Sequence, residues 1–453
     1  MTSFNLRKTS LWIHRYTGLA MAGFLIIASI TGTLLAFHDE LDGVFNQRLA
    51  YVDELQTPQL SIASLHDKVI NRYPEYGFST MPVTIEPNRA VVFVVDKYKG
   101  DVKVEPEPLF QEVYINPYSA DIIGARDKEQ WAWRNTMWKV FWLHRDLLLG
   151  DIGKLILGIV ALVWTLNCFI GFYLTLPRKT KNNQAKQNQN KHATKKRSSL
   201  LKRWLPAWKV RTKTNTFKLN YDLHHAFGLW LWLIFFVIAW SSVGFNLKQV
   251  YQPVMQAIVG LEGKDGKGDK SKKLTDLPTL NAKVASQDIV NQGTVNKDVV
   301  NKDVVNKANS IAYLSAQADI AAQKKGLSVT QLLGIRWIEE DNQWQLRFKT
   351  NQDIGKKGGA SSITVNAGSG SVERVNFGYQ SSSFGSKTDQ WLSTLHMGHI
   401  SDGAGHLLYQ IFLALVGLAV AVLSGTGVYL WWKGRQQRLK SSQNIQKGAA
   451  TVS

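Results

Sequence analysis

Cysteine is almost absent from this chain, and the common motifs for nucleotide and metal binding are missing. The single cysteine, Cys168, excludes a disulfide within the chain. There is no C-x-x-C-H run for covalent haem attachment, and no H-E-x-x-H or Cys/Met cluster indicates a zinc or copper site. No P-loop is present and no G-x-G-x-x-G opens a helix after a strand, which excludes P-loop nucleotide hydrolysis and a Rossmann nicotinamide site.

Charge is missing from four long stretches. Residues 16–37, 155–176, 226–247 and 407–432 contain no Asp, Glu, Lys or Arg. A helix needs about 20 apolar residues to cross a hydrocarbon core of about 30 Å, and each stretch reaches that length. The first run is too long for a signal peptide and no A-x-A-like site follows it, which indicates a retained helix. The sequence therefore predicts a membrane protein with four spanning helices.

Acidic residues are missing from one long loop. Residues 177–220 hold fourteen Lys or Arg and no acid, and residues 433–453 hold five more, again without an acid. Positive charge collects on the cytoplasmic side of a membrane protein. The termini and this loop are therefore predicted to be cytoplasmic, with the two other long segments outside. The net charge of +20 follows from this topology and does not indicate nucleic-acid binding.

These signals divide the chain into eight parts. They are a cytoplasmic N-terminus with the first span (1–38), a first outer domain (39–150), the second span (151–176), the basic loop (177–222), the third span (223–247), a second outer domain with a low-complexity linker (248–400), the fourth span (401–432) and a basic tail (433–453). In the linker, NKDVV occurs twice in tandem at 296–305. The order is that of one unit, two spans with an outer domain, written twice.

Each outer domain shows a helix followed by short strands. Helical spacing and β-branched or aromatic runs predict a helix at 61–73 and strands at 90–95 and 112–115 in the first domain, and a helix at 315–325 and strands at 334–339, 344–349 and 362–366 in the second. The expected fold class is an α-helical membrane protein, a four-helix bundle with two α+β domains on the outer side.

Short motifs support an internal duplication. HRYTGL at 14–19 resembles HHAFGL at 224–229, and LH at 143–144 recurs at 395–396. GKL at 153–155 corresponds to GHL at 405–407 at the same offset, whereas GFYL at 171–174 corresponds to GVYL at 427–430 one helical turn later. Repeats of this kind in membrane proteins place shared sites between the halves.

Eight of the ten histidines lie at or near a membrane end of a span, the exceptions being His66 and His192. Ionisable side chains at such depth are costly and usually functional. His14 and His224 begin the first and third spans at the cytoplasmic face, whereas His144 and His396 precede the second and fourth spans at the outer face. Two facing helices that each donate an imidazole suit an axially bis-histidine haem. The pattern therefore predicts two haem-iron sites, one at each side of the bundle.

Alternatives remain open for these positions. The cytoplasmic histidines are also compatible with binding of lipid phosphate, and His225 is an alternative to His224. At the outer face the further candidates for ligands or substrate contacts are His38, His399 and His406.

Tryptophans crowd the approach to the second span, at positions 131, 133, 138 and 142. An interfacial aromatic belt explains them in general terms. Together with neighbouring Arg134, Trp138 is also a candidate contact for a flat anionic ligand.

The motifs at 14–19, 143–145, 224–229 and 395–398, with TGTLL at 31–35 before ELD at 40–42, together resemble the PepSY-associated transmembrane helix proteins. VYINP at 113–117 is similar to the PepSY strand-turn pattern. The resemblance is greatest to the iron-regulated ferric-siderophore reductases of the bacterial inner membrane. It implies b-type haem in the bundle and PepSY-like domains in the periplasm, where Fe(III) is reduced to Fe(II) for iron acquisition.

The main expectation is thus a di-haem electron-transfer protein that reduces ferric siderophores, with a separate quinol or cytoplasmic reductase as donor because the chain lacks a nicotinamide motif. Expected substrate contacts are Trp138, Arg134 and His399. One alternative is a non-enzymatic, membrane-anchored PepSY module that binds a peptide or a protease. Another is a component of an iron-chelate transporter.

Overall fold

The structure is a computed structural model of the chain. It describes residues 5–96, 98–99, 102–103, 107–178, 199–261, 304–354, 361–380, 382–400 and 403–450. His192 and most of the tandem NKDVV repeat lie outside the described residues.

Three helices of the described residues are each long and apolar enough to cross a membrane. They are α1 (Leu6–Leu35), α6 (Gly150–Thr175) and α14 (Gly403–Ala450). Helix α14 contains a whole uncharged stretch, and α1 and α6 each contain one except for its last one or two residues. Hydrocarbon accommodates such helices because the backbone polar groups are paired within the helix. The chain is a multi-pass membrane protein. Helix α14 continues well past residue 432, where the predicted span ends, so the described part of the basic tail is helical.

The third uncharged stretch is not one straight helix, contrary to the sequence-based expectation. It is divided between α8 (Thr216–Trp230) and α9 (Trp232–Asn246), which meet at an angle of 71°. The two helices pack against different neighbours, α8 against α14 and α9 against α6. Counted as one bent span, the pair brings the number of candidate membrane spans among the described residues to four.

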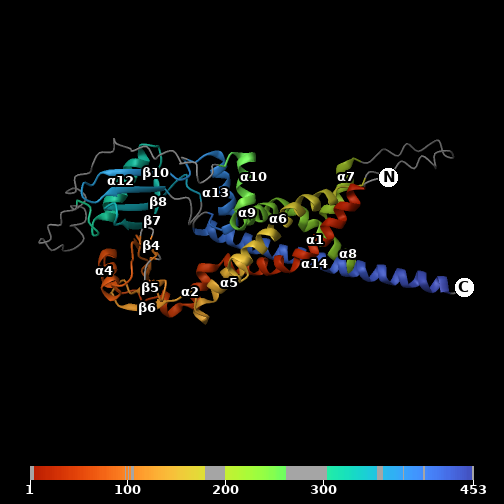
Figure 1. Ribbon diagram of the computed structural model, residues 1–453, viewed down its shortest axis with the longest axis horizontal. Helices are drawn as coiled ribbons and strands as arrows, with labels where there is room; N and C mark the ends of the chain where they lie inside the picture. Colours follow the sequence, from red (N-terminus) through yellow and green to blue (C-terminus); the bar gives the residue numbers. More distant parts are fainter. Residues whose placement is uncertain are drawn as a thin grey trace.

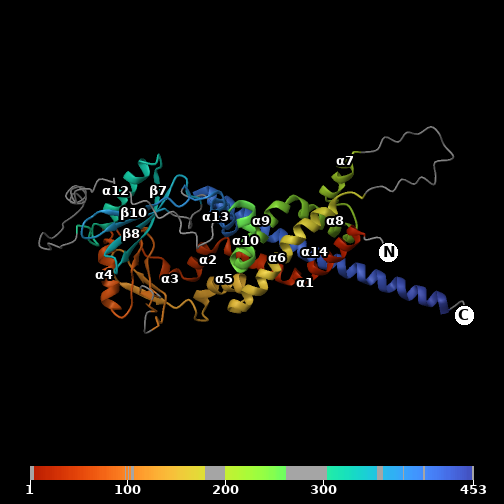
Figure 2. The same cartoon turned by 45° about the horizontal axis from the view of Figure 1, so that its top comes forward.

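The helices form an elongated bundle with different structures at its two ends (Figure 1). Both termini and α7 (Leu200–Trp204) lie at one end, here called the terminus end, and the sheets lie at the other, here called the sheet end (Figures 1 and 2). Helix α1 packs against α14 and α6. The termini and the described part of the basic loop, which the sequence predicts to be cytoplasmic, therefore lie at the same end of the bundle.

Short helices connect the spans to the sheets. The first half contributes α2 (His38–Phe45), α3 (Gln47–Ala50), α4 (Ile62–Arg72), η1 (Trp133–Asn135) and α5 (Thr136–Asp146), the second half contributes α10 (Lys248–Val259), α12 (Ser310–Gln323) and α13 (Phe384–Met397), and η3 (Leu205–Trp208) follows α7. Of the predicted helices, 61–73 agrees with α4, whereas 315–325 begins five residues after α12 does.

The strands form three antiparallel sheets among the described residues. They are β1 (Thr80–Met81), β2 (Val91–Val94), β3 (Tyr98–Lys99), β4 (Val102–Lys103), β5 (Glu112–Ile115), β6 (Ile122–Arg126), β7 (Val329–Ile338), β8 (Gln343–Thr350), β9 (Ser361–Asn366) and β10 (Val372–Asn376). The five-stranded sheet has the order β1-β7-β8-β9-β10, the three-stranded sheet β2-β5-β6, and β3 pairs with β4. Strand β1 of the first half thus lies at the edge of the sheet of the second half.

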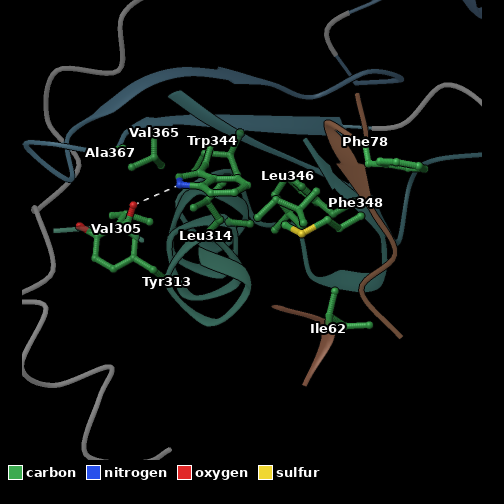
Figure 3. Packing of buried hydrophobic residues seen from close by; sticks show 14 of the residues in the cluster. Ile62, Phe78, Val305, Tyr313, Leu314, Trp344, Leu346, Phe348, Val365 and Ala367 are labelled. Atoms are coloured by element: carbon green, nitrogen blue, oxygen red, sulfur yellow. Dashed lines mark hydrogen bonds between the residues drawn. The ribbon is translucent and has the colours of Figure 1, made fainter. Parts of the chain in front are cut away.

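One hydrophobic core joins the two halves at the sheet end. Leu65 and Phe93 of the first half and Tyr313 and Phe348 of the second are fully buried members of a single cluster. Figure 3 shows part of this cluster, including the hydrogen bond of 3.1 Å from the Trp344 indole to the carbonyl of Val305. The two predicted outer domains are therefore packed together as one unit.

Acidification is expected to destabilise this core through His66. The ring is 7 % exposed, its Nε2 lies 2.6 Å from the carbonyl oxygen of Phe78, and burial lowers its pKa below the usual value. An unfolded histidine takes up a proton near pH 6.5, whereas the folded one resists it, so this contribution to stability is complete above about pH 6.5 and declines as the pH falls below it. Thermal unfolding followed by tryptophan fluorescence between pH 7.5 and 5 should show a smaller decline in His66→Gln than in the parent protein. An equal decline in both proteins would contradict the assignment.

Candidate functional site

Two helices begin in the same way at the terminus end. The side chain of Asn5 caps α1 by accepting a hydrogen bond from the backbone of Lys8, and the side chain of Asn215 caps α8 by accepting one from Lys218. Asn5 lies nine residues before His14, and Asn215 lies nine residues before His224. Because a cap determines where a helix starts, each half presents its histidine at the same height.

His14 and His224 face each other between these helices, with ring centroids 6.2 Å apart. His14 Nδ1 lies 2.9 Å from the Asn167 side-chain oxygen, and His224 Nδ1 lies 3.1 Å from the carbonyl oxygen of Leu423. A carbonyl oxygen only accepts, so Nδ1 carries the proton and donates it. In both rings Nε2 is then the nitrogen with a lone pair.

Glycines line this pair on two sides. A Cβ atom added to Gly171 or Gly427 would lie 3.2 Å from Cε1 of His14 or His224, respectively. Gly171 and Gly427, which begin the two GFYL/GVYL motifs, therefore occupy equivalent places beside the two histidines, although their motifs are one helical turn out of register. Gly18 and Gly228 lie one helical turn after His14 and His224, and their surroundings are open. An added Cβ at Gly18 would meet nothing within 4 Å, and at Gly228 it would meet only a Leu423 methyl, at 3.8 Å.

His144 and His396 form a second pair at the sheet end, with ring centroids 6.3 Å apart. His144 Nδ1 lies 2.9 Å from the carbonyl oxygen of Ala28 and 3.1 Å from the Thr31 hydroxyl. His396 Nδ1 lies 2.8 Å from the Ser241 hydroxyl. Ala28 and Thr31 belong to α1 and Ser241 belongs to α9, so each imidazole is oriented by a spanning helix.

The helices that carry this second pair end directly after it. Helix α5 is capped by left-handed Leu147 and α13 by left-handed Gly398. An added Cβ at Gly153 would lie 1.6 Å from the carbonyl oxygen of Asp146, so only glycine permits α6 to start this close to α5. The tight turn holds His144 between the spans.

The spacing within each pair would suit two imidazoles that share one metal ion. A metal–nitrogen bond of about 2.0–2.1 Å plus about 1.1 Å from the nitrogen to the ring centre gives roughly 6.3 Å between the two ring centres. Ring nitrogens that bind metals usually have their partner nitrogen held by a carbonyl or similar acceptor, as Nδ1 is here. In the described chain, no three His, Cys, Asp or Glu side chains form a group that could hold a metal ion. The donor sets are therefore two separate histidine pairs.

The remaining histidine candidates lie outside both pairs. The His225 ring lies 4.2 Å from the Tyr221 ring and 6.3 Å from the His224 ring. The His38 ring lies 5.6 Å from the Trp138 ring. His38, His399 and His406 line one small cavity. His66 packs against Phe93 of the sheet-end core, with ring centroids 5.5 Å apart.

Of the predicted substrate contacts in the first half, Trp138 lies beside His38. The Lys128 ammonium is 4.2 Å from the centre of the Trp138 ring. The Arg134 guanidinium donates to Gln130 at 2.9 Å. Among the described residues, the buried Trp138 Nε1 and Arg134 Nε have no hydrogen-bond partner.

The sequence reasoning did not identify the residues that orient the imidazoles. Asn167, Thr31 and Ser241 are polar groups inside otherwise apolar helices, and that placement was the available signal because such groups need a partner in hydrocarbon. The carbonyls of Ala28 and Leu423 leave no trace in the side-chain sequence.

The family model for the PepSY-associated TM region matches residues 11–434, nearly the whole chain. The chain belongs to this family. The match includes all four paired histidines and confirms the resemblance to the PepSY-associated transmembrane helix proteins. No curated protein matches the chain.

Proposed function

We propose that this PepSY-associated protein is a di-haem electron carrier of the bacterial inner membrane that reduces ferric siderophores on the periplasmic side. His14 with His224 would hold one haem and His144 with His396 the other. The observation that carries the proposal is the separation of about 6 Å within both pairs, together with the hydrogen bonds at all four Nδ1 atoms.

The position of the two pairs suits transfer across a membrane. His14 and Thr31, which touches His144, are seventeen residues apart on α1, or about 25 Å at a rise of 1.5 Å per residue. Bound haem supplies a one-electron carrier. Each Fe(III) that becomes Fe(II) takes one electron, which comes from a quinol or a cytoplasmic reductase that is itself oxidised.

Open space beside the terminus-end pair favours a flat group. Gly18 and Gly228 lie four residues after their histidines, so they occupy the same helix faces one turn deeper. Larger side chains at either position would enter that space. Glycine at both positions therefore leaves room for a planar ring beside the two imidazoles.

The sheet end offers contacts for an oxygen-rich chelate. Arg134 adds positive charge four residues before Trp138, and two buried donors of these residues, Arg134 Nε and Trp138 Nε1, lack partners in the described structure. A buried donor without a partner costs roughly 1–3 kcal/mol, which a ligand oxygen would recover. His399 lines the adjacent cavity.

Visible spectroscopy followed by a reduction assay tests the proposal. Protein from cells supplied with iron and haem precursor should give a low-spin b-type spectrum and two haems per chain. Mixing the dithionite-reduced, desalted protein with a ferric siderophore under argon should reoxidise the haem bands and release Fe(II) to a ferrous chelator, whereas iron-free siderophore should do neither. A colourless protein, or reduced bands that ferric siderophores leave unchanged, would contradict it.

Removing the Asn167 side-chain amide should weaken the binding of one of the two haems only. In Asn167→Leu the His14 Nδ1 loses its acceptor at 2.9 Å, and loss of such an orienting partner typically weakens binding roughly 10–100-fold. Haem transfer to apomyoglobin measures this affinity for each haem. The matched control is Thr426→Val at His224, where the carbonyl of Leu423 remains as an acceptor; this variant should release haem at the parental rate. Equal release from Asn167→Leu and the parent would refute the role of Asn167.

A further inference from the structure

A short helical segment packs over the end of α6 at the terminus end (Figures 1 and 2). It consists of α7 and η3, residues 200–208, and is here called the exit segment. The Trp204 indole donates to the Thr175 hydroxyl at 3.2 Å, and the Trp204 ring meets the Phe172 ring edge-on at 5.7 Å. Thr175 is the last residue of α6. The exit segment therefore lies where this span leaves the hydrocarbon.

The exit segment is also bonded to α8. The carbonyl oxygen of Trp208 accepts a hydrogen bond of 3.1 Å from the Trp230 indole. In the loop that follows, the Arg211 guanidinium donates to both carboxylate oxygens of Asp222, at 2.7 and 2.8 Å. Asp222 lies two residues before His224, and Trp230 lies six residues after it. The exit segment and its loop therefore hold α8 on both sides of this histidine.

One side of the exit segment is apolar and open. Leu200, Leu201 and Leu205 are 60, 66 and 53 % exposed. Leu201 and Leu205 are four residues apart, so they lie one turn apart on the same face, and Leu200 directly precedes Leu201. Leucines on a short interfacial helix bury their apolar surface by entering the boundary between lipid headgroups and acyl chains. At the end of a span, that boundary is the surface within their reach.

The positive charge beside these leucines is not neutralised by the chain. Lys202 and Lys209 are exposed, and neither forms an ion pair within the described residues. Asp222 is the only acid between residues 177 and 222, and Arg211 already binds it. An anionic partner is therefore complementary to the exit segment in charge, and a lipid leaflet is complementary to it in apolar surface as well.

The internal repeat does not account for the exit segment. Helix α6 ends at Thr175, one residue before its uncharged stretch does, and the exit segment covers that end. The corresponding span of the second half, α14, continues as one helix through residue 450. The duplicated framework therefore forms a span without such a segment, and the segment needs an explanation of its own.

We propose that the exit segment is a docking surface for anionic phospholipid of the leaflet at the terminus end. Its leucines lie beside the acyl chains, and Lys202 and Lys209 bind the headgroup phosphates. Each Lys or Arg close to an anionic lipid surface strengthens binding roughly fivefold. Through the bonds of Trp208 and Arg211, the bound lipid supports α8 around His224. The proposal depends neither on haem nor on the reduction of iron.

Quenching of one fluorophore by brominated lipids tests the proposal. Leu201→Cys is labelled with bimane, and the parent protein treated in the same way gives the background because Cys168 is buried. The full chain is reconstituted into phosphatidylcholine vesicles with increasing fractions of brominated phosphatidylglycerol or brominated phosphatidylcholine. The binding constant of phosphatidylglycerol relative to phosphatidylcholine should be at least roughly five. Adding Lys202→Gln/Lys209→Gln should bring this ratio close to one.

The matched control is Lys68→Gln/Lys325→Gln, which removes the same charge from two exposed positions at the sheet end and should keep the ratio of the labelled protein. Equal quenching by the two lipids, or an unchanged ratio in the exit-segment double variant, would overturn the proposal. Absence of quenching by either lipid would place residue 201 outside the membrane and would also overturn it. A greater loss of selectivity in sodium phosphate than in sodium chloride of equal ionic strength would assign the site to free phosphate instead of lipid. A protein without haem can pass this test, so its outcome is independent of the proposed electron transfer.

Discussion

His224→Ala is expected to contain one haem per chain where the parent contains two. His224 supplies one of the two imidazoles of the terminus-end pair, and its partner ring lies 6.2 Å away. The pair at the sheet end is carried by two other helices, α5 and α13. Haem is quantified as the pyridine haemochrome against protein from amino-acid analysis, and reduced spectra at low temperature show which band is lost.

His225→Ala is the matched control because it removes the neighbouring histidine. Its ring faces Tyr221 and lies 6.3 Å from His224, so both haems should remain. The counterpart His396→Ala should lose the other haem and keep the band that His224→Ala loses. Two haems in His224→Ala, or one in His225→Ala, would refute the pairing of His14 with His224.

Arg126→Ala is expected to destabilise the sheet end strongly. The guanidinium is 1 % exposed and donates to both Asp42 carboxylate oxygens, at 2.7 and 2.8 Å. It also donates to the Asn135 side chain at 2.9 Å and to the carbonyl of Arg134 at 2.7 Å. Strand β6 is thereby tied to α2 and η1, the connections to α1 and α5.

Removing one partner of a buried ion pair costs about 3–5 kcal/mol because the other charge stays buried and unpaired. A change of 1 kcal/mol shifts the melting temperature of a domain of 150–250 residues by roughly 2–4 °C, so a loss of about 10 °C is expected. Scanning fluorimetry on the intrinsic tryptophans measures it. The control Arg89→Ala breaks an exposed pair with Glu86 and should shift the midpoint by roughly 2 °C or less. Similar shifts in the two variants would show that the Arg126 network does not hold this end together.

The sequence by itself determined the membrane-spanning class of the protein and its internal repeat. Runs without charge report directly on the solvent that surrounds a helix, because a charged side chain in hydrocarbon is costly. Strand 112–115 agrees with β5, and 362–366 with β9 to within one residue, because a run of β-branched and aromatic residues is also a local signal. The motif pairs around His14 and His224 depend on the same kind of local comparison.

Only the tertiary structure decided how distant segments combine. The bend at Leu231, the pairing of β1 with β7 and the common core depend on contacts between residues far apart in the chain, which periodicity does not encode. The backbone carbonyls that orient His144 and His224 have no side-chain signature. The cavity beside Gln410 has no counterpart at Gly158 of α6, where Leu247 at the end of α9 packs closely, and only the folded chain shows this difference in packing.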